Sequence, residues 1–127
     1  MSGEIVFVSG TDTGVGKTVT AIWLASVLRV RGPVALIKPF QTGAMDPAQD
    51  GDEAVYRATL QETVTLRTLS TLADPLAPSI AARRAGVQLA PHEVAATCHA
   101  IAAKHEVTIV EGAGGLLVPI TDTVDMA

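Results

Sequence analysis

A glycine-rich loop near the N-terminus constrains the fold of this chain more than any other segment. Residues 10–18 read Gly-Thr-Asp-Thr-Gly-Val-Gly-Lys-Thr, between a β-prone apolar run at 5–8 and a run with helical apolar spacing. The apolar positions of that second run are Ile22, Leu24, Ala25 and Leu28. A strand, a glycine loop and a helix in this order are the context that a phosphate-binding loop requires. We therefore predict an α/β fold that opens with such a loop.

Backbone N–H groups of this loop are expected to bind phosphate. Glycines let several N–H groups point into one concavity, and the first turn of the next helix adds unpaired donors and the positive end of its dipole. Lys17 is expected to reach the β- and γ-phosphates, and the Thr18 hydroxyl to coordinate Mg²⁺. An ordinary tight turn ahead of a helix is the alternative interpretation. The residues predicted to contact the nucleotide here are Thr13, Gly14, Val15, Gly16, Lys17, Thr18 and Val19.

The rest of the chain alternates strand and helix patterns. After the first helix, the patterns predict a strand at 34–37, helices at 52–60, 79–85 and 91–104, and a third strand at 107–110. The segment 66–78 stays ambiguous, because Pro75 and Pro78 break regular structure. Alternating strands and helices predict a parallel sheet with right-handed crossovers, in three layers with helices on the faces. We expect residues 1–127 to form a single domain.

Composition narrows the class of protein. The chain has 127 residues, of which 48% are hydrophobic and 17% charged, a balance that excludes disorder. A net charge of −4 without a basic cluster argues against nucleic acid as a partner. No apolar stretch is long enough to span a membrane, and no secretory signal is evident. Because the one cysteine, Cys98, cannot form an internal disulfide, we expect a cytoplasmic protein.

Polar residues follow the predicted strands, where ligands bind in open parallel sheets. Residues 38–43, Lys-Pro-Phe-Gln-Thr-Gly, come after the second strand, and Glu111 with a glycine-rich stretch comes after the third. Mg²⁺ prefers a few oxygen ligands besides phosphate oxygens, so Thr18, Glu111 and one more carboxylate would suffice. Asp50, Asp52 and Glu53 are the candidates for the third ligand, and Asp52 is preferred because it opens the predicted helix. Lys38 is expected to be a fixed cation that stabilises charge developing during phosphoryl transfer.

Each of these three side chains has a simpler interpretation. Asp52 could be the N-cap of the helix that follows it. Glu111 could be a solvated strand end, and Lys38 an exposed lysine at the end of its strand. The glycines after Glu111 favour the functional interpretation, because they offer a second concave run of backbone N–H groups.

Three motifs taken together resemble dethiobiotin synthetase. They are the glycine loop at 10–18, Lys-Pro-Phe-Gln-Thr-Gly at 38–43, and Val-Glu-Gly-Ala-Gly-Gly-Leu-Leu-Val-Pro at 110–119. Five residues separate Gly10 from Gly16, one more than in the common phosphate-binding motif, and this is the spacing that the family uses. Residues 75–86 also resemble the family. The resemblance covers essentially the whole chain and implies a P-loop NTPase-type fold.

The resemblance implies an activity. Dethiobiotin synthetases convert 7,8-diaminopelargonate, CO2 and MgATP into dethiobiotin, ADP and phosphate in biotin biosynthesis. One amine forms a carbamate with CO2, ATP phosphorylates the carbamate, and the second amine attacks the mixed anhydride to close the ureido ring.

The resemblance also implies roles for individual residues. Lys17 and Lys38 take the catalytic positions, beside the γ-phosphate and beside the carbamate. Thr18, Asp52 and Glu111 match the metal ligands, and Thr42 matches a hydroxyl that contacts the substrate. Some members carry an acidic residue at the position of Gly14, which is therefore given a backbone role only. Backbone that approaches substrate and nucleotide is expected at Gly112, Ala113 and Gly114.

Members of the resembled family are longer than this chain. We therefore expect the N-terminal part of the full fold here, truncated at the C-terminus, with a homodimer in the full-length form.

Two other functions remain open. One is the nucleotide domain of a related cobyrinate-type amidase, which shares the phosphate loop. The other is a non-catalytic nucleotide-binding fragment or switch, although residues 9–13 lack the additional lysine that such switches usually carry.

Overall fold

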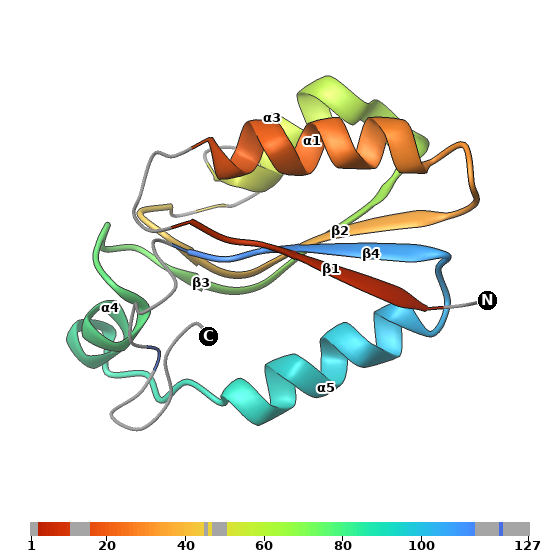
Figure 1. Cartoon of the computed structure of the whole chain (residues 1–127). Helices are drawn as coiled ribbons and strands as arrows, with labels where there is room; N and C mark the ends of the chain where they lie inside the picture. The colour runs from red at the N-terminus through yellow and green to blue at the C-terminus, as the bar shows by residue number, and fades with distance from the viewer. Residues whose placement is uncertain (1–2, 11–15, 45, 47–50, 114–119, 121–127) are drawn as a thin grey trace.

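One parallel β-sheet organises the computed structural model, which describes residues 3–10, 16–44, 46, 51–113 and 120. Its four strands lie in the order β1-β4-β2-β3 (Figure 1). Every pair of neighbours runs parallel. The strands are β1 Glu4–Val8, β2 Val34–Thr42, β3 Thr65–Leu72 and β4 Val107–Glu111.

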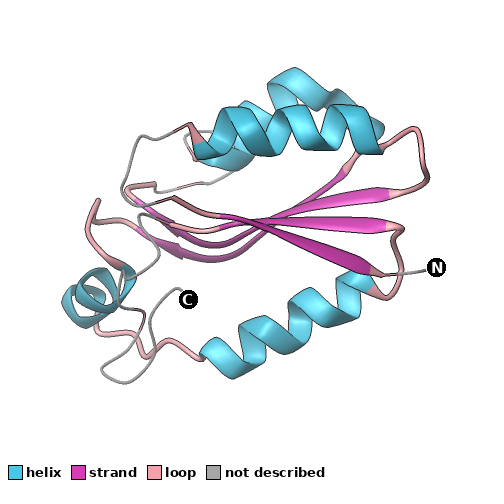
Figure 2. Ribbon diagram, in the orientation of Figure 1, coloured by secondary structure: helices cyan, strands magenta, loops and turns pink. Residues whose placement is uncertain are grey.

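Helices cover both faces of this sheet. Helices α1 and α3 lie on one face, and α5 with α4 lies on the other (Figures 1 and 2). Their bounds are α1 Lys17–Leu28, α3 Asp52–Leu60, α4 Pro78–Ala85 and α5 Pro91–Ala102, with a 3-10 turn η1 at Gln61–Thr63. The predicted three-layer α/β fold is therefore confirmed. Among the described helices, none has both the length and the apolarity that a bilayer span requires.

The core lies between the two central strands and the helices. Residues 34–40 of β2 and all of β4 are buried, as expected for parallel strands that are covered on both faces. On the α1 side, Ala21 and Ala25 are completely buried against a cluster that includes Leu36 and Ile109. These alanines present no side chain beyond Cβ, so α1 can pack close to the sheet. This packing sets where the first turn of α1 lies.

Strand β3 is missing from the sequence prediction, which left residues 66–78 ambiguous. The structure pairs it with β2 from Ala35↔Thr65 to Thr42↔Leu72. Exposed and half-buried residues alternate over its first half, as in an edge strand, and the prolines lie beyond its end. The strand at 107–110 is consequently the fourth and not the third. The helix predicted at 91–104 ends earlier, at Ala102.

Strand β2 is longer than the predicted 34–37, and its extension creates the site. Its pairing with β4 ends at Ile37↔Val110, whereas its pairing with β3 continues to Thr42↔Leu72. Lys38 therefore lies within the strand and not in a loop after it. Beyond residue 37, β2 and β4 are no longer paired at the carboxyl edge of the sheet.

We predict that a larger side chain between α1 and the sheet destabilises the protein. Replacing the buried Ala25 by leucine should lower the free energy of unfolding by about 1–3 kcal/mol, because the added methyl groups have no space. Urea denaturation followed by circular dichroism measures this difference. The control is Val27→Leu on the exposed side of α1, expected to change stability by about 0.5 kcal/mol or less. Equal stability of the two variants would contradict the close packing of α1.

Candidate functional site

The register of β2 and β4 places Lys38 next to Glu111. Both residues directly follow the last paired positions, Ile37 and Val110. The ammonium nitrogen Nζ of Lys38 lies 3.0 Å from Oε2 of Glu111 and 2.7 Å from Oδ2 of Asp52. It also donates to the carbonyl oxygen of Gly112 at 3.3 Å. The three N–H donors of the lysine thus have three acceptors.

The charged groups of Lys38 and Glu111 are buried, which is rare for charged side chains. Glu111 is fully buried, and the Lys38 side chain is only 6% exposed. A charge that is removed from water must be paired, and here each partner compensates the other. The interpretations of Glu111 as a solvated strand end and of Lys38 as an exposed lysine are therefore wrong.

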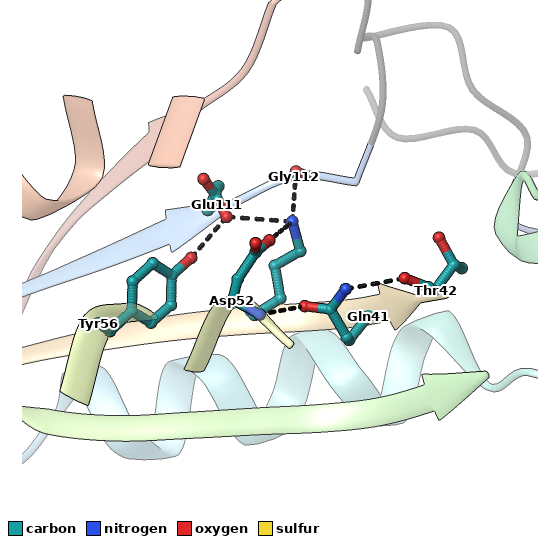
Figure 3. A network of polar contacts seen from close by, with 7 residues as sticks. Gln41, Thr42, Asp52, Tyr56, Glu111 and Gly112 are labelled. Carbon is teal, nitrogen blue, oxygen red and sulfur yellow. Dashed lines mark hydrogen bonds and ion pairs between the residues drawn. The ribbon is translucent and has the colours of Figure 1, made fainter. Parts of the chain in front are cut away.

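A hydrogen bond from a side chain of β2 holds Asp52 in place. It is the first residue of α3, and Gly51 occupies the N-cap without a capping side chain. Oε1 of Gln41 accepts the N–H of Asp52 at 2.9 Å, while Nε2 of Gln41 donates to the Thr42 carbonyl at 2.8 Å (Figure 3). The N-cap interpretation of Asp52 is thus wrong. Gln41, which the sequence analysis did not assign, ties the start of α3 to the end of β2 and so keeps Asp52 beside Lys38.

Tyr56 is the second residue that the sequence analysis missed. Its hydroxyl donates to Oε2 of Glu111 at 2.5 Å (Figure 3). Burial raises the pKa of Tyr56 far above its usual range, and the charge and hydrogen bond of Glu111 and the charge of Asp52 raise it further. The phenol therefore stays neutral and acts as a donor. A signal existed in the sequence, since Tyr56 follows Asp52 by four residues and so shares its helix face.

One oxygen of Glu111 remains available to a metal ion. Oε1 is buried and has no hydrogen-bond partner among the described residues. An ionised oxygen in this state is costly, and a cation would offset the cost. The described residues contain no group of three or more His, Cys, Asp or Glu arranged to hold a metal. Thr18, Asp52 and Glu111 line one cavity and offer oxygen donors of the kind that Mg²⁺ prefers, and their binding of the ion stays a prediction.

A cavity of about 660 Å³ joins this cluster to the start of α1. This volume lies within the range of small-molecule sites, about 300–1,000 Å³. It brings together most of the predicted site residues that the structure describes. Its lining is Gly16, Lys17, Thr18, Val19, Lys38, Gln41, Thr42, Asp52, Pro75, Leu76, Ala77, Pro78, Glu111 and Ala113. Gly112 contributes its carbonyl to Lys38, and the predicted contacts Thr13, Gly14, Val15 and Gly114 lie outside the described residues.

The amino end of α1 suits an anion. Gly16 is its N-cap with φ 85°, a left-handed conformation that favours glycine. The first turn has no acidic residue and no capping side chain, and it carries Lys17 and Thr18. Gly16, Lys17, Thr18 and Val19 line the cavity, and the dipole and unpaired backbone N–H groups of a helix start favour an anion there.

Comparison with known proteins shows the family of this chain. Residues 4–127 match the AAA domain family. The chain belongs to this family. It is 46% identical over 122 residues to the ATP-dependent dethiobiotin synthetase of Streptomyces avermitilis. This match covers 94% of this chain and 50% of that protein. The synthetase of Anaeromyxobacter dehalogenans is 41% identical over 119 residues, 91% of this chain and 53% of that protein.

A third relative has a similar identity and coverage. The ATP-dependent dethiobiotin synthetase of Streptomyces coelicolor is 45% identical over 116 residues, 90% of this chain and 48% of that protein. These comparisons confirm the resemblance to dethiobiotin synthetase. The chain spans about half the length of the curated relatives it matches.

We predict that the buried ion cluster depends on Lys38. Lys38→Met keeps the length of the side chain but leaves the buried carboxylate of Glu111 without its cation, which should lower the free energy of unfolding by about 3–5 kcal/mol. Urea denaturation at neutral pH measures the loss. Lys104→Met, at an exposed position after α5, is the control and should change little. If the two variants were equally stable, the cluster would not be the buried ion pair described above.

Proposed function

We propose that this chain forms the nucleotide-binding and metal-binding part of an ATP-dependent dethiobiotin synthetase. The proposed reaction converts 7,8-diaminopelargonate, CO2 and ATP into dethiobiotin, ADP and phosphate. The observation that carries the proposal is the placement of Lys38 between Asp52 and Glu111, in the same cavity as the start of α1. The names of the relatives, whose matches cover 90–94% of this chain, support the same assignment.

The nucleotide end of the cavity is proposed to be the start of α1. The N–H groups after Gly16 and the ammonium of Lys17 bind the phosphates, as the helix dipole favours. Thr18, Asp52 and Glu111 hold Mg²⁺, which when bound neutralises charge on the phosphate oxygens.

Lys38 is proposed to bind the substrate carbamate. An amine and CO2 form the carbamate with release of a proton, and phosphoryl transfer from ATP to the carbamate oxygen releases ADP. The second amine then attacks the carbonyl carbon and loses a proton, and phosphate leaves as the ring closes. Because Lys38 already has three acceptors, an incoming carbamate oxygen must replace one of them, and the Gly112 carbonyl at 3.3 Å is the most distant. Asp52 and Glu111 hold the ammonium during this exchange, so only its contact with the Gly112 carbonyl has to change.

The substrate end of the cavity is proposed to lie between Thr42 and the segment 75–78. The Thr42 side chain offers a hydroxyl, and Pro75, Leu76 and Pro78 supply an apolar wall that suits an aliphatic chain. The expected homodimer, the cytoplasmic location and the absence of nucleic-acid and membrane partners stay predictions.

We predict that Lys17 contributes to ATP affinity. Lys17→Ala removes a charge-assisted contact with the phosphates, worth about 1.5–3 kcal/mol, so the dissociation constant for MgATP should rise roughly tenfold or more. Isothermal titration calorimetry measures the change. Lys104→Ala is the matched control, since it removes a lysine that does not line the cavity. Unchanged affinity in Lys17→Ala would show that phosphate binds elsewhere.

The proposed reaction can be tested in a chimera. It joins this chain to the half of the Streptomyces avermitilis synthetase that the chain does not match. Incubated with 7,8-diaminopelargonate, bicarbonate and MgATP, the chimera should form dethiobiotin, detected by mass spectrometry.

In the same chimera, Asp52→Asn and Glu111→Gln should lower the rate more than they lower ATP affinity and should raise the Mg²⁺ requirement, because the ion stabilises charge during transfer. A folded chimera that binds ATP but forms no product would contradict the proposed activity. A normal rate of Glu111→Gln at low Mg²⁺ would show that the metal site is misplaced.

A further inference from the structure

The contact between Tyr56 and Glu111 has a consequence for the metal site. We propose that Tyr56 is a positioning residue, whose hydroxyl holds Oε2 of Glu111 and so leaves Oε1 as the oxygen that meets the metal ion. This inference rests on the proposed MgATP site. It assigns to Tyr56 a role that none of the three sequence motifs includes.

Two donors converge on one oxygen of this carboxylate. The Tyr56 hydroxyl lies 2.5 Å from Oε2 of Glu111, at the short end of the range for a bond from a neutral hydroxyl to an ionised oxygen. Lys38 donates to the same Oε2 at 3.0 Å. The other oxygen, Oε1, has no partner in the described part of the chain, and Figure 3 shows it pointing away from the Tyr56 hydroxyl. The carboxylate therefore presents one occupied and one available oxygen.

Lys38 also contacts Oε2, but it constrains the carboxylate less than the Tyr56 hydroxyl does. Its ammonium is a compact charge with rotatable donors, and it is shared with Asp52 and the Gly112 carbonyl. The Tyr56 hydroxyl, in contrast, is directional, because its ring is completely buried in the cluster that also contains Leu36, Leu60 and Ile109. Packing of the ring thus fixes the hydroxyl, and the hydroxyl fixes the rotation of the Glu111 carboxylate.

A tyrosine suits this role better than a second cation would. A phenol carries no positive charge, so its hydrogen bond orients Glu111 without supplying a counter-charge. Lys38 is then the one cation in contact with Glu111 among the described residues, and it is shared with Asp52. Tyr56 also shares α3 with Asp52, so one helix positions both carboxylates: Asp52 belongs to it, and Glu111 is held by it.

The alternative is a structural role only, in which Tyr56 satisfies a buried carboxylate and has no effect on metal binding. Tyr56→Phe separates the two, because it keeps the ring and removes the hydroxyl. Ser26→Ala is the matched control, since it removes a half-buried hydroxyl that donates to the Ile22 carbonyl and does not line the cavity. Both variants are compared with the unchanged chain.

Mn²⁺ serves as the probe for the metal. Its affinity for the protein–ATP complex is measured by electron paramagnetic resonance, and ATP affinity is measured separately in the presence of EDTA. In Tyr56→Phe, Mn²⁺ affinity should fall about tenfold, as is typical when a partner of a metal ligand is removed, while metal-free ATP affinity stays unchanged. Ser26→Ala should bind Mn²⁺ as the unchanged chain does.

A second measurement leaves the fold intact. Tyr56 is the one tyrosine of the chain, so labelling with 3-fluorotyrosine gives a single ¹⁹F resonance from this site. Adding Mg²⁺ to the ATP complex should shift that resonance, because a cation on Oε1 withdraws charge from the carboxylate that accepts the phenol.

The outcomes separate this inference from the proposed function. Wild-type Mn²⁺ affinity in Tyr56→Phe, or an unchanged ¹⁹F resonance when Mg²⁺ is added to a formed ATP complex, overturns the positioning role and leaves the nucleotide site standing. Absence of ATP binding by the unchanged chain overturns both. Should Tyr56→Phe fail to fold, the ¹⁹F measurement alone decides.

Discussion

The ammonium of Lys38, buried between two carboxylates, is the interaction on which the site depends. It contacts Asp52 and Glu111 at the point where β2 and β4 stop pairing, so it links the central strands and α3 at the carboxyl edge of the sheet. Two carboxylates and one ammonium leave one formal negative charge in excess. Among the residues that the structure describes, Oε1 of Glu111 has no hydrogen-bond partner, so we place the excess there. A site that is incompletely compensated in this way is suited to bind a cation, because binding offsets a cost already present in the fold.

The apolar core determines where the charges lie. Ala21 and Ala25 let α1 pack closely on the sheet, and this brings Gly16 and Lys17 to the cavity that contains Lys38. Tyr56 belongs to both regions, since its ring packs in the core and its hydroxyl donates to Glu111. Stability and site geometry are therefore coupled through α3. A change in how this helix packs would move Asp52 and the partner of Glu111 together.

Much of the fold could be predicted because its signals are local. The strand, glycine loop and first helix follow from residues 5–28, and the buried strand at 107–110 follows from its apolar run. Strand β3 could not be assigned, because an edge strand of mixed polar and apolar residues has a weak pattern and is stabilised by pairing with β2. The same pairing extends β2 to Thr42, beyond the apolar run that predicted it.

The sequence by itself determined which residue types surround the site: the loop ending in Lys17 and Thr18, and the polar residues Lys38, Asp52 and Glu111. Their motifs are contiguous, and the strand ends of a parallel sheet lie at one edge. Only the tertiary structure decided how they contact one another. The ion pair of Lys38 and Glu111 joins residues 73 positions apart, and it follows from the register of two strands. The roles of Gln41 and Tyr56 also depend on how α3 packs on the sheet. The spacing of Tyr56 from Asp52 indicates a shared helix face, but only the packing brings its hydroxyl to Glu111.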